Sequence, residues 1–103
     1  MAADLDAIVL EDVSDTKGRY VYRGAGAEAF MTFSRAGASR LIIDHTEVPD
    51  AFKGQGVGAA LVERAVADAG AAGKTILPLC PFAAAQFRKN PEWADVLDRR
   101  TKR

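Results

Sequence analysis

The 103-residue sequence lacks the marks of several large protein classes. Its single cysteine, Cys80, excludes an internal disulfide bond and a zinc site built from a cysteine cluster. No apolar run approaches the ~18 residues that a membrane-spanning helix needs. Fourteen basic and fourteen acidic residues cancel. We therefore expect no metal site, and bulk charge gives no reason to expect a nucleic acid or an anionic membrane as a partner.

We expect no targeting or binding segment at either end of the sequence. Residues 1–11 have no basic segment and no long apolar run, so we expect no signal peptide. The basic tail, residues 99–103, is expected to be a solvated chain end rather than a nucleic-acid-binding arm. Together with the single cysteine, these features favour a cytoplasmic location.

The residues that are present fit one globular domain. The hydrophobic fraction is 49% and the charged fraction 27%, both near globular averages. The sequence shows no internal repeat and no low-complexity linker. We therefore expect a single domain over residues 1–103.

The order of the predicted elements sets the fold class. Local patterns predict three strands, a glycine-rich turn, a helix, a fourth strand and two further helices, over 19–23, 27–34, 40–48, 53–58, 59–69, 75–80, 82–89 and 92–99. The first three strands should form an antiparallel meander, with 19–23 at an exposed edge that allows a monomer or a weak dimer. The unit from 40–48 to 75–80 requires parallel pairing. The prediction is an α+β (α/β layered) fold with helices packed on a mixed sheet.

The glycine-rich turn Lys53-Gly54-Gln55-Gly56-Val57-Gly58 leads directly into the helix that is predicted from Ala59. The N-terminus of a helix presents unpaired backbone N–H groups and a partial positive charge. Glycines let a phosphate approach that backbone closely, and the lysine adds a full charge. Residues 53–59 therefore predict a pyrophosphate cradle. The alternative is a tight turn whose glycines serve only the backbone.

Two nucleotide-binding motifs fit this turn poorly. Gly54-x-Gly56-x-x-Ala59 matches the dinucleotide fingerprint, but the turn does not follow its strand at once. Cys80 also stands where that fingerprint expects an acidic residue. A P-loop needs Lys and Ser or Thr after its glycines, and two alanines stand there.

A third motif fits better. Lys53-x-x-Gly56-x-Gly58 resembles the Q/R-x-x-G-x-G/A signature of the GCN5-related N-acetyltransferase (GNAT) superfamily, with lysine at the first position. Further segments follow in order and strengthen the resemblance: His45-Thr46-Glu47-Val48-Pro49, Pro78-Leu79-Cys80-Pro81-Phe82 and Asn90-Pro91-Glu92. Together they resemble the small Yjdj-type N-acetyltransferase domain, over roughly residues 18–98.

The resemblance implies a minimal fold that binds acetyl-CoA as cosubstrate and has a reduced acceptor side. The acceptor is then an amine of unknown identity, on a small molecule or a protein lysine. The residues expected at acetyl-CoA are Val48, Lys53, Gly54, Gln55, Gly56, Val57, Gly58, Ala59 and Phe82. Core packing is the alternative role for the phenylalanine.

The predicted topology brings three further side chains to the same place. The strands at 40–48 and 75–80 should run parallel, so their carboxyl ends share one edge of the sheet, where ligands of open α/β sheets bind. We therefore expect His45, Glu47 and Cys80 to meet the cradle in one cleft. His45 and Glu47 should also share a strand face, because side chains alternate along a strand.

These residue types suit acetyl transfer from a thioester to an amine. Imidazole exchanges its proton near neutral pH, so His45 is the candidate base. Cys80 is a candidate to protonate the leaving thiolate or to accept the acetyl group, and backbone N–H groups near Val48 to hold the thioester oxygen. The alternatives are a structural histidine, a buried small cysteine and a solvated Glu47. The preferred function is direct transfer in a ternary complex, and the alternative is a CoA-binding module with little catalysis.

Overall fold

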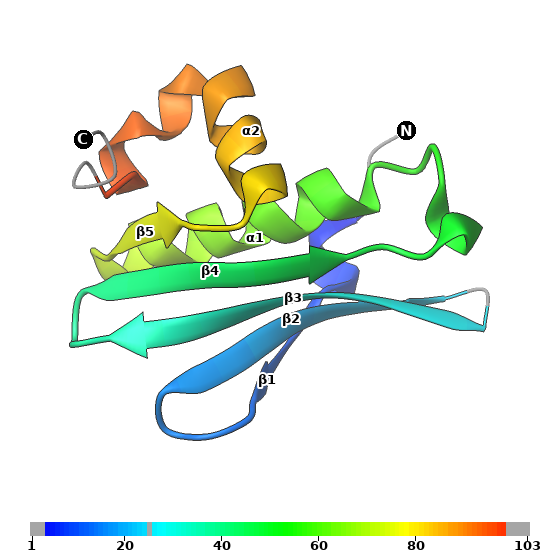
Figure 1. The fold of residues 1–103 in the computed structure, drawn as a ribbon, viewed down its shortest axis with the longest axis horizontal. Coiled ribbons are helices and arrows are strands. Elements are labelled where there is room, and N and C mark those ends of the chain that lie inside the picture. Colours follow the sequence, from blue (N-terminus) through cyan, green and yellow to red (C-terminus); the bar gives the residue numbers. More distant parts are fainter. Residues whose placement is uncertain (1–3, 25, 99–103) are drawn as a thin grey trace.

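The computed structural model describes residues 4–24 and 26–98 (Figure 1). The basic tail at 99–103 lies outside the described residues, so its role stays a prediction. The elements, in chain order, are η1 (Leu5–Ala7), β1 (Val9–Asp12), β2 (Lys17–Gly24), β3 (Ala27–Ala36), β4 (Arg40–Glu47), η2 (Asp50–Phe52), α1 (Val57–Ala72), β5 (Thr75–Pro78), α2 (Pro81–Lys89) and η3 (Pro91–Val96). None of the helices in the described part is both long and apolar enough to span a membrane.

One mixed sheet organises the fold. Its five strands lie in sequence order, β1-β2-β3-β4-β5. Neighbours from β1 to β4 pair antiparallel, and β5 pairs parallel with β4. In Figure 1, α1, which follows β4 and precedes β5 in the chain, runs along one face of the sheet. The helices α2 and η3 lie beyond the β5 edge. The predicted α+β architecture with a mixed sheet and packed helices is confirmed.

Two predicted details are wrong at the edges of the sheet. The strand at 19–23 is not an edge, because Val9–Asp12 form an additional strand paired along β2. The exposed edge expected at 19–23 therefore does not exist. The predicted last helix, 92–99, is the 3-10 helix η3, after which Leu97 bridges to Ile76 of β5.

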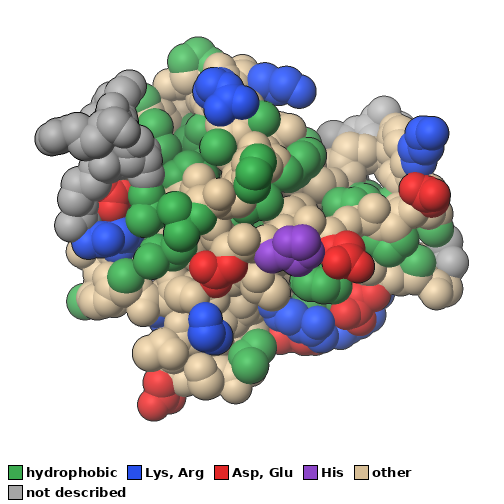
Figure 2. All heavy atoms as spheres, viewed as in Figure 1, with side chains coloured by type: hydrophobic (Ala, Val, Ile, Leu, Met, Phe, Trp, Pro, Cys, Tyr) green, Lys and Arg blue, Asp and Glu red, His purple; other side chains and the backbone are tan. Residues whose placement is uncertain are grey.

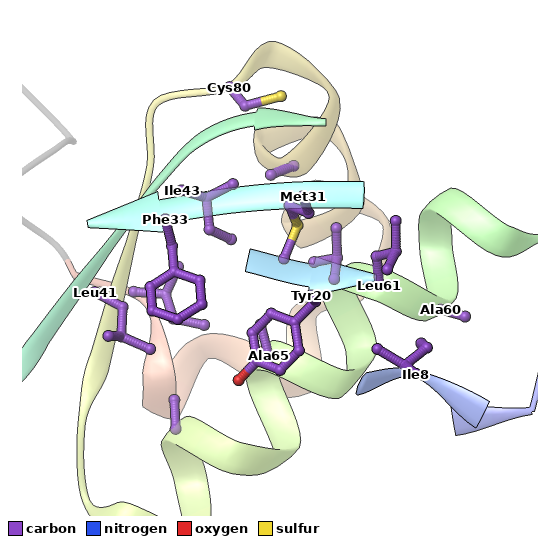
Figure 3. Packing of buried hydrophobic residues seen from close by; sticks show 14 of the residues in the cluster. Ile8, Tyr20, Met31, Phe33, Leu41, Ile43, Ala60, Leu61, Ala65 and Cys80 are labelled. Atoms are coloured by element: carbon purple, nitrogen blue, oxygen red, sulfur yellow. The ribbon is translucent and has the colours of Figure 1, made fainter. Parts of the chain in front are cut away.

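The core lies between the sheet and α1 (Figure 3). The helix turns Leu61, Ala65 and Ala69 toward the strands, each at most 2% exposed. Tyr20 and Met31 meet them from β2 and β3 and are just as deeply buried. Burying a large apolar side chain contributes about 1.5–3 kcal/mol, so this face fixes how α1 lies on the sheet.

The other face of the sheet carries ion pairs. Glu11 and Glu28 each pair with both Arg19 and Arg23, at N–O distances of 2.8 to 3.3 Å, which closes a ring of four alternating charges. Val21 lies fully buried on the same face, although it is outside the main core. This outer face is therefore polar and reachable from solvent beside the carboxyl end of β4.

Candidate functional site

The glycine turn links β4 to α1 through two left-handed residues. Gly54 has φ = 80° and Gly56 has φ = 71°, a region that other L residues rarely adopt. Phe52, only 2% exposed, anchors η2 in the core just before the turn. Glycine at these two positions therefore lets the chain reverse into the helix without backbone strain.

The turn leaves a row of backbone donors open. Within the described part of the chain, the N–H groups of Gly56, Val57, Gly58 and Ala59 have no hydrogen-bond acceptor, as expected for a first helical turn. Lys53 is exposed beside them and forms no ion pair with another described residue. A Cβ on Gly54 would meet nothing within 4 Å, so there is open space above the turn. This arrangement fits a phosphate-bearing cosubstrate.

Three elements meet at Gly58, the second residue of α1. A Cβ built on Gly58 would lie 2.7 Å from Cζ of Phe82 and 3.4 Å from Cγ2 of Val48. The glycine therefore lets the start of α2 and the end of β4 approach the helix closely. Phe82 stays 39% exposed and Val48 37%, so both offer apolar surface at the rim of the turn.

The neighbouring strands β4 and β5 separate at this end of the sheet. Their last pair is Ile43 with Pro78. Beyond it, the N–H groups of Leu79 and Cys80 both donate to the carbonyl oxygen of Ile43, at 3.2 and 3.1 Å. β4 then continues to Glu47 paired only with β3. The predicted strand 75–80 thus ends at Pro78, and beyond it the start of α2, rather than a paired strand, lies beside β4.

Cys80 lies between β4 and α2 as the N-cap residue of α2, buried at 6% exposure. Its Sγ is 3.6 Å from Oγ1 of Thr46 on β4. Burial raises the pKa of the Cys80 thiol, but the backbone N–H groups of Ala83 and Phe82, with the hydroxyl and N–H of Thr46, lower that pKa by more. The thiol is therefore more acidic than an ordinary cysteine.

His45 and Glu47 point to the opposite face of the sheet. Phe33 pairs with Ile43 and Thr32 pairs with His45, so the register shifts and Asp44 is an extra residue. Beyond this bulge the outward positions of β4 are His45 and Glu47. Figure 2 shows the histidine, in purple, on this open face with acidic side chains beside it.

The two outward side chains contact each other. Nε2 of His45 lies 3.3 Å from Oε1 of Glu47, and the side chains are 60% and 62% exposed. The ring of Phe30 lies 6.3 Å from the imidazole, centroid to centroid, and is tilted by 55° to it. The prediction that His45 and Glu47 share one strand face is confirmed.

The structure thus gathers the predicted residues into two groups rather than one cleft. Val48, the glycine turn, Phe82 and Cys80 lie on the α1 side of β4, where Thr46 also points. His45 and Glu47 lie on the open side. The expectation of a single shared cleft is wrong, because the bulge at Asp44 turns His45 away from the core. In the described ranges, no three His, Cys, Asp or Glu side chains group as a metal site would require.

The comparison with protein families agrees with this geometry. The model of the GCN5-related N-acetyl-transferase family matches residues 19–96, most of the chain. The chain belongs to this family. No curated protein matches the chain. The GNAT assignment makes acetyl transfer the general chemistry of this domain, and the Yjdj subtype stays a prediction.

Thr46 is the residue of this GNAT domain that sequence reasoning missed. It lies between the two candidate side chains of β4 but points to the opposite face, where its hydroxyl reaches Cys80. Its place within the segment His45-Thr46-Glu47 gave a signal, since alternate residues of a strand face opposite ways. The bulge at Asp44 hid which of the two faces that would be.

Proposed function

We propose that this GNAT domain binds acetyl-CoA at the glycine turn and transfers its acetyl group to an amine. The open N-terminus of α1 lies against the end of β4 and the start of α2, and this carries the proposal, because a Cβ on Gly58 would contact both Val48 and Phe82. A pyrophosphate and a thioester are two parts of one CoA molecule. The arrangement supports binding of both at once.

The cosubstrate would be held mainly by backbone. The pyrophosphate accepts hydrogen bonds from the N–H groups at the start of α1, from Gly56 to Ala59, with Lys53 as the nearby cation. Gln55 lies in the same turn, although its side-chain amide donates to the carbonyl oxygen of Ala51 at 3.3 Å. Val48 and Phe82 offer apolar contact to the arm that links the pyrophosphate to the thioester. Acetyl-CoA supplies the activated acyl group.

The transfer then needs proton movements that these residues can make. The amine nitrogen forms a bond to the acetyl carbon, and the carbon–sulfur bond breaks. His45 takes the proton that the amine loses, and Glu47 stabilises the imidazolium ion across 3.3 Å. The leaving thiolate takes a proton from Cys80 or from water. A backbone N–H near Val48 holds the thioester oxygen as negative charge develops.

The positions of His45 and Cys80 suggest two directions of approach. The cosubstrate enters on the α1 side, and the acceptor amine comes from the open face that carries His45. Within residues 4–24 and 26–98 the sheet ends at β5, so no further strand walls that face. Such an open surface suits an amine on an accessible segment, such as a protein lysine, better than a small molecule that needs enclosure.

The same openness favours a second candidate, a CoA-binding module with little turnover. The catalytic candidates His45 and Glu47 are more than half exposed, whereas catalysis gains most where water is excluded. The two functions differ in rate and share the binding site.

Calorimetric titration with acetyl-CoA, using NADH as the control ligand, tests the binding step. We expect saturable binding of acetyl-CoA and none of NADH. Preference for NADH, or no acetyl-CoA binding at millimolar ligand, would refute both candidates.

Release of CoA in the presence of lysine-containing peptides separates the enzyme from the binding module. For the enzyme, His45→Gln should lower kcat/KM about a hundredfold. Cys80→Ser should leave turnover largely intact if the amine attacks directly. Mass spectrometry of protein incubated with acetyl-CoA alone reports an acetylated Cys80, which would instead establish a covalent route. Tight binding without CoA release would favour the module.

A further inference from the structure

A cavity lies between the sheet and the last turns of α1. It has a volume of about 350 Å³ and is lined from β1 to β4 on one side and by the end of α1 on the other. The glycine turn is at the opposite end of this 16-residue helix, about 18 Å away at 1.5 Å per residue. The cavity is therefore separate from the proposed acetyl-CoA site.

Small helix residues leave this space open. Where α1 turns Leu61 and Val62 to the sheet, both side chains are fully buried. Near its end the helix presents Ala69 and Ala72 to the cavity instead. Leu10 faces the same side of the sheet as its partner Tyr20, yet it remains 41% exposed. The helix end thus fails to cover apolar surface that the strands offer.

The wall of the cavity is apolar and aromatic. Leu10, Phe33 and Leu41 line it with the ring of Tyr20. Figure 3 shows Tyr20, Phe33 and Leu41 pointing together toward α1. The rings of Tyr20 and Phe33 lie 5.4 Å apart, centroid to centroid. This surface suits a hydrocarbon or an aromatic ring.

The charged residues that line the cavity are two bases and one acid. Arg35 and Lys74 are its basic lining residues and Asp68 its acidic one. Asp68 is already occupied, because Oδ2 accepts from the Tyr20 hydroxyl at 2.8 Å and from Nε of Arg64 at 3.2 Å. Lys74 forms no ion pair with a side chain in the described part of the chain.

Arg35 adds a second positive group that is only partly neutralised. Its guanidinium lies over the ring of Phe33, 5.1 Å from the centroid, and pairs with Asp12. That carboxylate is 70% exposed, so water competes for it. A carboxylate entering the cavity would therefore meet two cations and, among the described lining residues, no unpaired carboxylate.

We propose that this cavity binds a small apolar or aromatic molecule that carries one carboxylate. The hydrocarbon part occupies the space between Leu10, Phe33 and the alanines of α1, and the carboxylate lies between Arg35 and Lys74. The volume is within the range of small-molecule pockets, about 300–1,000 Å³. This site is independent of the acetyl-transfer function.

Calorimetric titration with 3-phenylpropionate tests the proposal, with 3-phenylpropanamide as the uncharged analogue and acetate as the charge without the ring. We expect saturable binding of the acid, binding of the amide weaker by about tenfold or more, and no binding of acetate. Equal affinity for acid and amide would overturn the role of Arg35 and Lys74. No saturable binding of the acid at millimolar concentration would overturn the site itself.

Matched variants on one helix place the ligand. Ala72→Leu fills the cavity and should abolish binding, whereas Ala67→Leu changes another exposed alanine of α1 outside it and should not. Lys74→Gln should weaken binding of the acid but not binding of the amide. Lys89→Gln, which changes a lysine outside the cavity, is its control. Circular dichroism checks that each variant is folded, which is expected because Ala72 is solvent-exposed. Unchanged binding in Ala72→Leu would refute the assignment.

Discussion

The two ends of α1 provide a matched test of the phosphate cradle. Gly56 and Gly73 flank the helix with nearly equal left-handed φ angles, 71° and 69°. Aspartate adopts this region more readily than most L residues. Gly56→Asp and Gly73→Asp should therefore carry a similar backbone cost of about 1 kcal/mol. What distinguishes the two variants is where the new charge lies.

The new charge should make Gly73→Asp the less stable variant and Gly56→Asp the variant that binds CoA more weakly. The helix dipole favours an anion at the N-terminus and disfavours it at the C-terminus, by about 0.3–1 kcal/mol each. Gly73→Asp should thus be less stable than Gly56→Asp by about 0.6–2 kcal/mol. A carboxylate at Gly56, at about 6 Å from a phosphate charge, repels it by about 1–3 kcal/mol at effective dielectric constants of 80 to 20.

That repulsion corresponds to a loss of CoA affinity of about fivefold to a hundredfold. From Gly73 the charge is about 24 Å away along the helix, beyond two Debye lengths at physiological salt. Urea denaturation and calorimetric titration with CoA measure both quantities on the same samples. The more stable variant should be the one that binds CoA worse. Equal CoA affinity in the two variants would refute the cradle.

Three further predictions follow from buried contacts. Burial, with a hydrogen bond to a carboxylate, raises the pKa of Tyr20 above its ordinary value of 10.0. The folded state therefore keeps this proton when the unfolded chain loses it, and the free energy of unfolding should fall as the pH rises above about 10. Tyr20→Phe should remove that fall in pH-dependent denaturation, and an unchanged profile would contradict the assignment. Leu61→Ala should lower the unfolding free energy by about 2–5 kcal/mol and Leu79→Ala, at 61% exposure, by less than about 0.5 kcal/mol, as judged by urea midpoints. Thr46→Val should raise the pKa of the Cys80 thiol, measured by thiolate absorbance, because it removes a hydroxyl that lowers it.

The parts of the fold that could be predicted are those with strong local patterns. The apolar run in β4 and the glycine turn before α1 predicted the parallel strand–helix–strand unit that the structure contains. β1 was missed because its four residues include two acids, and only pairing with β2 makes them a strand. Glu11 is paired with Arg19 and Arg23, contacts that no local pattern reveals. Contacts between residues that are far apart in the sequence therefore determine this edge of the sheet.

The candidate site was predictable in composition but not in its division between two faces. The side-chain types and their place at the carboxyl ends of β4 and β5 could be read from spacing. Strict alternation from buried Ile43 would turn His45 inward, toward Cys80. The bulge at Asp44 reverses that parity, and it depends on the register against β3. A single sequence holds no sign of such a register shift.

The bulge also gives the site one spare residue of chain length. Without Asp44, His45 would follow Ile43 directly and would still lie opposite Thr32, so His45 and Glu47 would keep their outward face and Thr46 its inward one. Closing the bulge with Asp44 retained would instead shift the pairing by one residue, which would turn His45 and Glu47 inward and Thr46 outward. Within this strand, therefore, the pairing register matters more to the site than the number of residues, and relatives that lack one residue at this position would keep the same faces.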